Sequence, residues 1–431
     1  MVLIKRILII IYFICYFYSI YCLISAKFQL KNSISNIKAG RFRNLKIHSI
    51  NSDKNSSQTK FELKELSGIY DELSSIEPIY NHPNKYTIEN IYFLITTNAD
   101  RIRFTINFIN FWSKIARINC LIVFEEEDYI KKGTIRYLLQ YHGIPCQIKT
   151  SNITRYEERY LQLIDIGWSL IKTEKKPIEW VAISDDDTIW FIDNLLKTLG
   201  QFDTSKLIYL GNISDRNDTI YRHGNYYAYG GGGILLTRPL VSLSSKSFQV
   251  CRKNFVNMFG GDEMIGKCLT EILKVNLTIN KHFHQMDHIG DMEGYLQSGI
   301  EGLVTLHHMF SYWEPFPMEH IENEIEILEL IKTAYRRLNS DYLKRYVKIN
   351  ESKNQTLLLT NGYSFTLFNR ILTRHELNQL EITWSDSQVY QRKTRPKEKN
   401  KIDYFFYKFS DLLTNSSIYQ YKKRQIEILF Q

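Results

Sequence analysis

The chain has 431 residues, of which 44% are hydrophobic and 14% aromatic, so it holds enough apolar material for a large core. No segment is poor enough in apolar residues to indicate long disorder. The formal charge is +9, but the basic residues are scattered and no RNA-reading or helix-turn-helix signature is present. We therefore expect no nucleic-acid partner, which leaves a membrane surface or an anionic small substrate to account for the charge.

An uncharged apolar stretch lies close to the N-terminus. ILIIIYFICYFYSIYCLI spans residues 7–24 and follows a Lys-Arg pair. About 20 apolar residues cross a bilayer as a helix, and the apolar part of a secretory signal is usually shorter. The pattern predicts a cytoplasmic tail at 1–6 and a signal-anchor transmembrane helix at 7–26.

Cleavage of this stretch is the alternative. Lys27 and Lys31 weaken the charge asymmetry that orients an anchor, and Ala26 could end a cleaved signal peptide. Both versions place the body of the protein in the secretory lumen. With the anchor retained, we expect a single-pass type II protein of the Golgi or endoplasmic reticulum membrane.

Glycan acceptors and cysteines agree with a lumenal location. Asn-x-Ser/Thr triplets without proline begin at Asn55, Asn152, Asn212, Asn217, Asn276, Asn350, Asn354 and Asn415, some of them expected by chance in a chain rich in Asn. Beyond the apolar stretch the cysteines are Cys120, Cys146, Cys251 and Cys268. They can form two disulfides, whose pairing the spacing leaves open. The absence of a CxxC pair argues against a zinc ribbon.

Strands and helices alternate after a polar segment, 27–87, that we interpret as a stem. Strand patterns fall at 88–98, 118–128, 145–150 and 178–184, and helical patterns between them at 101–116, 129–143 and 155–174. Such alternation predicts an α/β domain built on a parallel sheet. Ligands of open α/β sheets bind beyond the carboxyl ends of strands, which is where three consecutive aspartates fall.

Those aspartates are Asp185, Asp186 and Asp187, in WVAISDDDTIWF. Oxygen ligands suit Mg²⁺ or Mn²⁺, which proteins often bind through one or two carboxylates together with substrate phosphates. A metal at this position could bridge the diphosphate of a nucleotide sugar. The alternative is a solvated acidic turn in which Asp187 caps the next helix.

Two further features follow in the same domain. Four glycines, 230–233, interrupt YYAYGGGGILLTRPL, either to let backbone approach a ligand or to form a bulge or flexible loop. Asp262, in GGDEMIGKCLTEIL, stands where a helix should start. It could be an N-cap, or an exposed carboxylate suited to general-base catalysis.

Histidines cluster late in the chain, in NKHFHQMDHIGD and VTLHHM. A lone histidine is usually structural, but an Asp-rich metal site often recruits one imidazole from elsewhere in the fold. Beyond about residue 320 the pattern changes to a charged helix at 322–346. A hairpin around Asn361 and Gly362 is predicted in TLLLTNGYSFTLFN.

The order of these segments resembles the Fringe-related β-1,3-glycosyltransferases of glycosyltransferase family 31. The similarity is carried by WVAISDDDTIWFIDNLLKTL, YAYGGGGILLTRPL, GGDEMIGKCL, FHQMDHIGD and VTLHHM. It is greatest to the plant and fungal branch known as domain of unknown function number 604. That branch's C-terminal extension is similar to NGYSFTLFNRILTRHELNQLEITW, so the resemblance covers roughly 88–395.

The resemblance implies a GT-A fold, with a Rossmann-like mixed sheet flanked by helices, on the N-terminal membrane anchor. It also implies a UDP-sugar donor, Mn²⁺ and inversion at the anomeric carbon, with a glycan or glycoprotein hydroxyl as acceptor. It implies a glycosyltransferase domain at 88–320 and an extension at 321–431. The resemblance also implies roles for individual residues. Donor and metal would be bound by Asp185, Asp186 and Asp187, and the loop near donor and acceptor would be Gly231, Gly232 and Gly233. The nucleotide pocket would include Thr96 and Thr97, the catalytic base would be Asp262, and a further metal ligand would be His307 or His284. Asp187 is the first choice for a direct metal ligand. Gly261 departs from many relatives, which have another acid there.

Two other classes of function stay open at this point. A lumenal binding protein that kept the fold and lost catalysis would have nearly the same sequence features. A metal-dependent phosphohydrolase could also use clustered aspartates, although it usually needs more acidic or histidine ligands than this region offers. The donor sugar and the acceptor do not follow from the sequence, because one or two side chains can change either specificity.

Overall fold

The structure is a computed structural model, and the statements below concern the residues that it describes. These are 44–50, 60–64, 85–113, 118–126, 132–173, 178–214, 227–286, 290–291, 293–297, 302–309, 313–316, 323–381, 394–405, 408–409, 416–421 and 424–430. The predicted tail and signal anchor, 1–26, lie outside them. Across the described ranges, no helix has the length and apolarity that crossing a bilayer requires.

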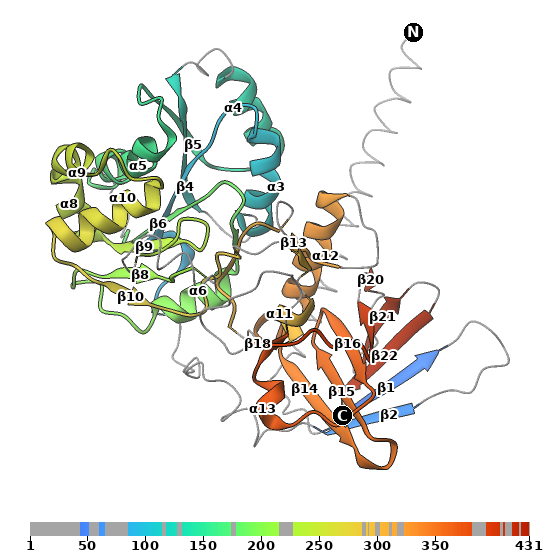
Figure 1. The fold of residues 1–431 in the computed structure, drawn as a ribbon. Helices are drawn as coiled ribbons and strands as arrows, with labels where there is room; N and C mark the ends of the chain where they lie inside the picture. The colour runs from blue at the N-terminus through green and yellow to red at the C-terminus, as the bar shows by residue number, and fades with distance from the viewer. Residues whose placement is uncertain are drawn as a thin grey trace, which may run out of the picture.

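A seven-stranded sheet is the centre of the fold, at the upper left of Figure 1. Its strands in spatial order are β10 (Leu277–Ile279), β8 (Tyr209–Gly211), β9 (Ile234–Thr237), β6 (Trp180–Ser184), β3 (Ile91–Thr96), β4 (Asn119–Glu125) and β5 (Gln147–Ser151). Strands β6, β3, β4 and β5 are parallel, which confirms the predicted alternation. Strand β9 runs antiparallel to both β6 and β8, so the sheet as a whole is mixed, as expected of the GT-A fold that the resemblance implies.

Both faces of this sheet are covered by helices, because successive side chains of a strand point to opposite sides. On β3, Phe93 and Ile95 join one buried apolar cluster, whereas Tyr92 and Leu94 join the other. The first cluster includes side chains of α3 (Ile102–Ser113), α4 (Lys132–Tyr141), α6 (Ile192–Leu199) and α12 (Glu324–Leu338). The second includes side chains of α5 (Tyr156–Ile171), α8 (Arg238–Lys246), α9 (Phe248–Phe255) and α10 (Gly261–Lys267), which continues into the π-helix η3 (Cys268–Ile272).

A four-stranded antiparallel sheet follows in the C-terminal part, at the lower right of Figure 1. Its order is β14 (Arg345–Asn350), β15 (Gln355–Thr360), β16 (Ser364–Phe368) and β19 (Lys401–Phe405). The turn between β15 and β16 contains Asn361 and Gly362, whose φ of +79° favours glycine. The hairpin predicted there is confirmed. The remaining helical elements are η1 (Ile88–Asn90), α11 (Glu293–Gln297), η4 (Asn339–Asp341), η5 (Glu351–Lys353) and α13 (Arg374–Leu377).

A third sheet joins distant parts of the sequence. Its order is β2 (Lys60–Lys64), β1 (Asn44–Ile50), β22 (Arg424–Phe430), β21 (Ser416–Tyr421) and β20 (Lys408–Phe409), and all its pairs are antiparallel. Strand β1 lies inside the segment that we interpreted as a stem, yet it pairs with the C-terminal strand. The polar composition of that segment gave no sign of these strands.

Three two-stranded pairs complete the described secondary structure. They are β7 (Ile189–Trp190) with β12 (Thr305–Leu306), β11 (Gly290–Asp291) with β13 (Trp313–Glu314), and β17 (Leu380–Glu381) with β18 (Thr394–Arg395). The pair of β7 and β12 matters most for the site. It holds the segment after the aspartates beside the segment that precedes His307.

The disulfides and the glycan acceptors can now be compared with the sequence predictions. The cysteines pair as Cys120–Cys146 and Cys251–Cys268, so both predicted disulfides are present and the fold decides their pairing. Among the acceptors, Asn212 is 2% exposed and its side-chain amide donates to the Phe283 carbonyl at 2.6 Å. A glycan could not be attached there without unfolding, so the Asn212 triplet is one of the chance matches.

Candidate active site

The three aspartates occupy a tight turn between β6 and β7, at the carboxyl end of β6. Asp186 and Asp187 are 8% and 7% exposed, so a freely solvated acidic turn does not describe them. Asp187 does not cap the next helix either, because α6 has Phe191 at its N-cap position. Buried carboxylates need charged partners, and each of these has one.

Asp186 is neutralised by Arg101, the residue before α3. The guanidinium donates through Nε and Nη2 to the two carboxylate oxygens at 2.8 and 2.7 Å. The hydroxyls of Thr97 and Thr105 also donate to the Oδ2 atom of Asp186. These contacts hold both oxygens of Asp186 and fix the turn against β3 and α3, and donor binding by Asp186 stays a prediction.

Thr96 and Thr97 lie at the end of β3, next to the turn that holds the aspartates. Thr96 is fully buried, donates to the Val123 carbonyl at 3.2 Å and accepts a hydrogen bond from Arg159 Nε at 3.0 Å. Thr97 is 1% exposed. This corrects the expectation that the two threonines bind the nucleotide directly, because their hydroxyls are directed to protein groups. Thr97 instead acts through Asp186.

His307 lies against the other two aspartates. Its Nε2 atom is 2.9 Å from Asp187 Oδ1 and 3.3 Å from Asp185 Oδ2. Its Nδ1 atom lies 3.1 Å from the backbone carbonyl oxygen of Gln285. A carbonyl can only accept, so Nδ1 carries a proton and donates it. Metal-bound histidines are oriented by the same kind of contact, which leaves the second nitrogen facing the ion.

The pKa values of Asp187 and His307 depend on one another. Burial alone raises the pKa of Asp187, but the His307 imidazole outweighs it and lowers that pKa to about 2. Burial also lowers the pKa of His307, but Asp187 and Asp185 outweigh it and raise it well above its usual range. The His307 imidazole is therefore protonated on both nitrogens, and its positive charge balances the nearby carboxylates. A divalent cation bound by these three groups would supply that positive charge instead.

The donor set fits a divalent metal only in part. Within the described ranges no three His, Cys, Asp or Glu side chains are placed so that they could hold a metal ion together. One imidazole nitrogen, His307 Nε2, nevertheless lies within 3.3 Å of an oxygen of each of two carboxylates. Mg²⁺ and Mn²⁺ commonly take one or two protein carboxylates and complete their shell with water and substrate phosphates. Asp187, Asp185 and His307 suit that partial kind of site.

His284, the alternative metal ligand, has different surroundings. Its ring meets the Tyr295 ring edge-on, with centroids 5.4 Å apart, and its Nδ1 atom is hydrogen-bonded to the Tyr295 hydroxyl. Its backbone N–H donates to Thr305 Oγ1 at 3.2 Å. Of the two histidines, the structure therefore brings His307 to the aspartates and packs His284 on α11, which corrects the prediction for His284.

The glycine run forms a compact turn against which site side chains pack. The Gly233 N–H donates to the Gly230 carbonyl at 2.9 Å, and Gly233 has a φ of +91°. A Cβ atom at Gly231 would lie 2.1 Å from His307 Nδ1, and one at Gly233 would lie 2.6 Å from the Trp190 ring. The predicted close approach of backbone is present, but what approaches is the protein's own histidine and tryptophan.

Side chains from three segments hold the carbonyls and amides of this turn. Thr188 donates to Gly231 O at 3.1 Å, and Thr305 donates to Gly232 O at 2.6 Å. The Gly232 N–H donates to Gln285 Oε1 at 2.9 Å. The turn therefore connects the aspartate segment with the segments that carry and orient His307.

Asp262 is attached to the same turn. Its Oδ2 atom accepts from the Gly230 N–H at 2.9 Å, and its Oδ1 atom accepts from the Glu263 N–H at 2.8 Å. Gly260 is the N-cap of α10 and Asp262 the second residue of the helix, so the N-cap interpretation is wrong. Burial, with a smaller contribution from Asp185, raises the pKa of Asp262 to about 6, although the Gly230 amide opposes the change. A carboxylate with such a pKa suits general-base catalysis near neutral pH.

Several residues of the site were missed by the sequence analysis. Arg101 and Gln285 are the clearest, since one neutralises Asp186 and the other orients His307 and the glycine turn. Tyr160 is 2% exposed, and burial and then the Asp185 charge raise its pKa well above its usual range. A search for the cation that three adjacent aspartates require could have indicated Arg101. Nothing local indicated Gln285 or Tyr160.

Comparison with known proteins finds two family models and a curated relative that match this chain. A family model described as Fringe-like matches residues 96–321, more than half of the chain. A second model, described as a protein of unknown function, DUF604, matches residues 219–428. The mouse protein named beta-1,3-glucosyltransferase is 29% identical over 143 residues, which are 33% of this chain and 27% of that relative. The match therefore spans about a quarter of the relative's length.

Two solved structures with similarity to this chain are described as glycosyltransferases. One is described as involved in glycosylation of the major capsid of PBCV-1, with 12% identity, a TM-score of 0.33, and coverage of 52% of this chain and 96% of that one. Another is the galactosyltransferase LgtC in complex with donor and acceptor sugar analogs. It has 10% identity and a TM-score of 0.35, and the match covers 61% of this chain and 98% of that one.

Proposed function

This chain belongs to the Fringe-like family, and from that premise we propose that it is an inverting glycosyltransferase. It moves a hexose or N-acetylhexosamine from a UDP-sugar to a hydroxyl of a glycan or glycoprotein, forming a β-1,3 linkage. The mixed sheet flanked by helices supports the GT-A fold that this family implies. The observation that carries the proposal is that one glycine turn is shared by Asp262 and by the group formed by Asp187, Asp185 and His307.

The two parts of the site have complementary roles in this proposal. Asp187, His307 and Asp185 hold Mn²⁺, which when bound supplies positive charge for the diphosphate of the donor. Asp262 accepts the proton of the acceptor hydroxyl while that oxygen bonds to the anomeric carbon and the bond to UDP breaks. Arg101 keeps Asp186 neutralised and the turn in place.

A panel of UDP-sugars tests the proposal. The purified full chain is incubated with each of UDP-glucose, UDP-galactose and UDP-N-acetylglucosamine, with Mn²⁺ or with a chelator, and UDP release is measured with and without simple glycoside acceptors. We expect one donor to be consumed only with Mn²⁺ and faster with an acceptor. Mn²⁺-dependent UDP binding without turnover of any donor would indicate a binding protein that kept the fold.

The location in the cell belongs to the same proposal. The apolar stretch at 7–24 and the two disulfides support a Golgi or endoplasmic reticulum membrane protein whose catalytic domain faces the lumen. Asn152, Asn276 and Asn354 are exposed and can accept glycans. Glycosidase treatment should lower the apparent mass of the expressed protein. An unchanged mass together with recovery in the cytosolic fraction would contradict this location.

A further inference from the structure

Phe259 is the most exposed large hydrophobic side chain among the described residues, at 84%. It lies in the connection between α9 and α10, three residues before Asp262. Burying a phenyl ring gains about 1.5–3 kcal/mol, which this side chain forgoes. A single exposed ring is ordinary on a protein surface, so its meaning depends on what holds it and on what lies beside it.

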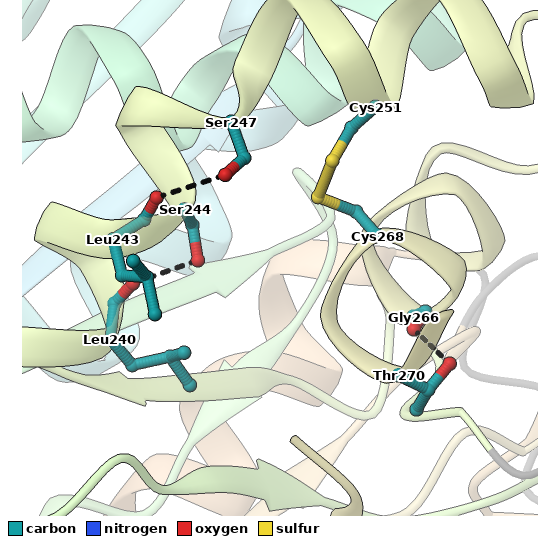
Figure 2. The surroundings of a disulfide bond; sticks show 8 residues. All are labelled: Leu240, Leu243, Ser244, Ser247, Cys251, Gly266, Cys268 and Thr270. Carbon is teal, nitrogen blue, oxygen red and sulfur yellow. Dashed lines mark hydrogen bonds between the residues drawn. A yellow bond between two sulfur atoms is a disulfide. The ribbon is translucent and has the colours of Figure 1, made fainter. Parts of the chain in front are cut away.

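The backbone that carries Phe259 is fixed on both sides. The Arg155 guanidinium donates to the Met258 carbonyl at 2.6 Å, and the Phe259 N–H donates to Glu263 Oε2 at 3.3 Å. The disulfide Cys251–Cys268 joins the helices that flank the connection, as Figure 2 shows. The backbone that carries the ring is therefore already fixed, so ligand binding does not have to order it.

Two hydroxyl groups near the disulfide bond within their own helical segments. Ser244 donates to the Leu240 carbonyl at 2.8 Å within α8, and Thr270 donates to the Gly266 carbonyl at 2.8 Å after α10 (Figure 2). Both contacts are local, to the carbonyl four residues earlier, and neither involves the Phe259 connection.

The anchored connection also touches the candidate base. A Cβ atom at Gly260 would lie 2.4 Å from Asp262 Oδ1, so the residue after Phe259 is in contact with that carboxylate. Three residues span at most about 11 Å of chain, so the phenyl ring begins within about 11 Å of Asp262.

A second partly exposed aromatic residue lies on the helix that packs against this connection. Tyr156 is the first residue of α5 and is 40% exposed. Its neighbour Arg155 makes the contact to Met258, and the carbonyl of Glu157 lies 2.9 Å from where a Gly261 Cβ would be. The first turn of α5 and the Phe259 connection are therefore packed side by side next to the base.

We propose that Phe259 forms the surface on which the acceptor's pyranose ring stacks. The face of an aromatic ring is electronegative, and a pyranose presents C–H groups on one face and hydroxyls at its rim. Stacking on Phe259 leaves the rim free to turn one hydroxyl toward Asp262. This inference rests on the proposed function and names the acceptor side of that same site.

The test measures acceptor kinetics of Phe259→Ala and Phe259→Trp in the full chain, with methyl glycosides and, in parallel, glycopeptides as acceptors and with the donor found in the UDP-sugar panel. Phe259→Ala should raise the acceptor KM roughly 2–12-fold, the range for one aromatic contact. Phe259→Trp should keep it near the wild-type value. Tyr141→Ala is the matched control, since Tyr141 is 73% exposed on α4 and should leave the acceptor KM unchanged.

Three outcomes would overturn the inference. They are an unchanged KM in Phe259→Ala, a Trp variant as poor as the Ala variant, and a rise in KM confined to glycopeptide acceptors, which would make the surface a peptide site. UDP affinity of each variant checks its folding. If the wild-type chain consumes no UDP-sugar, the proposed function fails, whereas normal consumption with an unchanged KM removes this inference alone.

Discussion

Asp187 and Asp262 are the same residue type in two regions of one site, and their environments have opposite effects. Asp187 follows β6 and lies against His307, with the guanidinium of Arg101 3.8 Å away, and its pKa falls to about 2. Asp262 is the second residue of α10 and accepts hydrogen bonds from two backbone amides, and its pKa rises to about 6. Burial raises both values, so the neighbouring cations make the difference.

This contrast separates the roles of the two carboxylates. A carboxylate that stays ionised through the physiological range can hold a cation, whereas one that titrates near neutrality can accept and release a proton. Pairs of titratable groups whose pKa values are pushed apart commonly mark such a division of labour. Variants that change one of the two regions at a time can test whether Asp187 and Asp262 have separate roles.

The largest effect is expected for Asp262→Asn. Removal of a general base typically costs about 10²–10⁴-fold in rate, and kcat should fall by that factor. Asn keeps an oxygen for one of the two amide contacts, so the fold and the Mn²⁺-dependent affinity for UDP should be largely retained. Steady-state transfer assays and calorimetric UDP titration check both statements. Transfer at a near wild-type rate would show that Asp262 is structural.

The complementary change is His307→Ala, with His284→Ala as its matched control. Loss of a contact around a bound metal costs about 10–100-fold in metal affinity, and loss of a ligand should cost at least as much. His307→Ala should therefore weaken Mn²⁺-dependent UDP binding by this factor or more, and His284→Ala should weaken it less. Mn²⁺ titrations in the presence of UDP measure both. A larger loss in His284→Ala would restore that residue as the ligand.

Gly261→Ala tests how the base region is positioned. A Cβ atom at Gly261 would lie 2.3 Å from the Tyr160 Cβ and 2.9 Å from the Glu157 carbonyl, so α10 must move away from α5. Such overpacking typically costs about 1–3 kcal/mol of unfolding free energy. Denaturant unfolding should show this loss, and kcat should fall while UDP affinity persists.

Gly133→Ala is the control for that variant. No atom lies within 4 Å of a Cβ atom at Gly133, in the first turn of α4, so the change should stabilise the chain by about 0.4–1 kcal/mol. Equal stability of the two alanine variants would contradict the close packing of α10 on α5.

The smallest effect is expected in the pH profile. A base must be deprotonated to act, and the pKa of Asp262 is raised to about 6. Below this value kcat/KM should fall about tenfold per pH unit, and above it the rate should level off. The residual activity of Asp262→Asn should lack this acidic limb. If kcat/KM of the wild-type chain falls only around pH 4, the pKa of Asp262 is that of an ordinary solvated carboxylate, and the predicted increase is contradicted.

Much of the central domain could be predicted from the sequence, because its strands and helices have strong and distinct periodicities. The elements from β3 to β6 lie where the alternation predicted them, and the turn after β6 holds the aspartates. The hairpin at Gly362 was predicted because its turn requires a residue that tolerates positive φ. The antiparallel direction of β9 did not follow from its residue pattern, since an apolar run carries no signal of direction.

The roles of individual site residues depended on contacts between distant segments. His307 meets Asp187 because β12 pairs with β7, and the segment VTLHHM that contains His307 carries no signal of that pairing. The sequence indicated that Thr97 belongs to the site but did not indicate its role, because that role depends on the hydrogen bond from its hydroxyl to Asp186.

The sequence by itself determined the class of fold, the order of the motifs and the family, because those depend on local periodicity and on residue types in a fixed order. The tertiary structure decided which histidine joins the aspartates, which aspartate is neutralised by Arg101 and why Asp262 is no helix cap. It also decided the pKa contrast between Asp187 and Asp262. These properties arise from burial and from charges brought together across the chain, which no local pattern encodes.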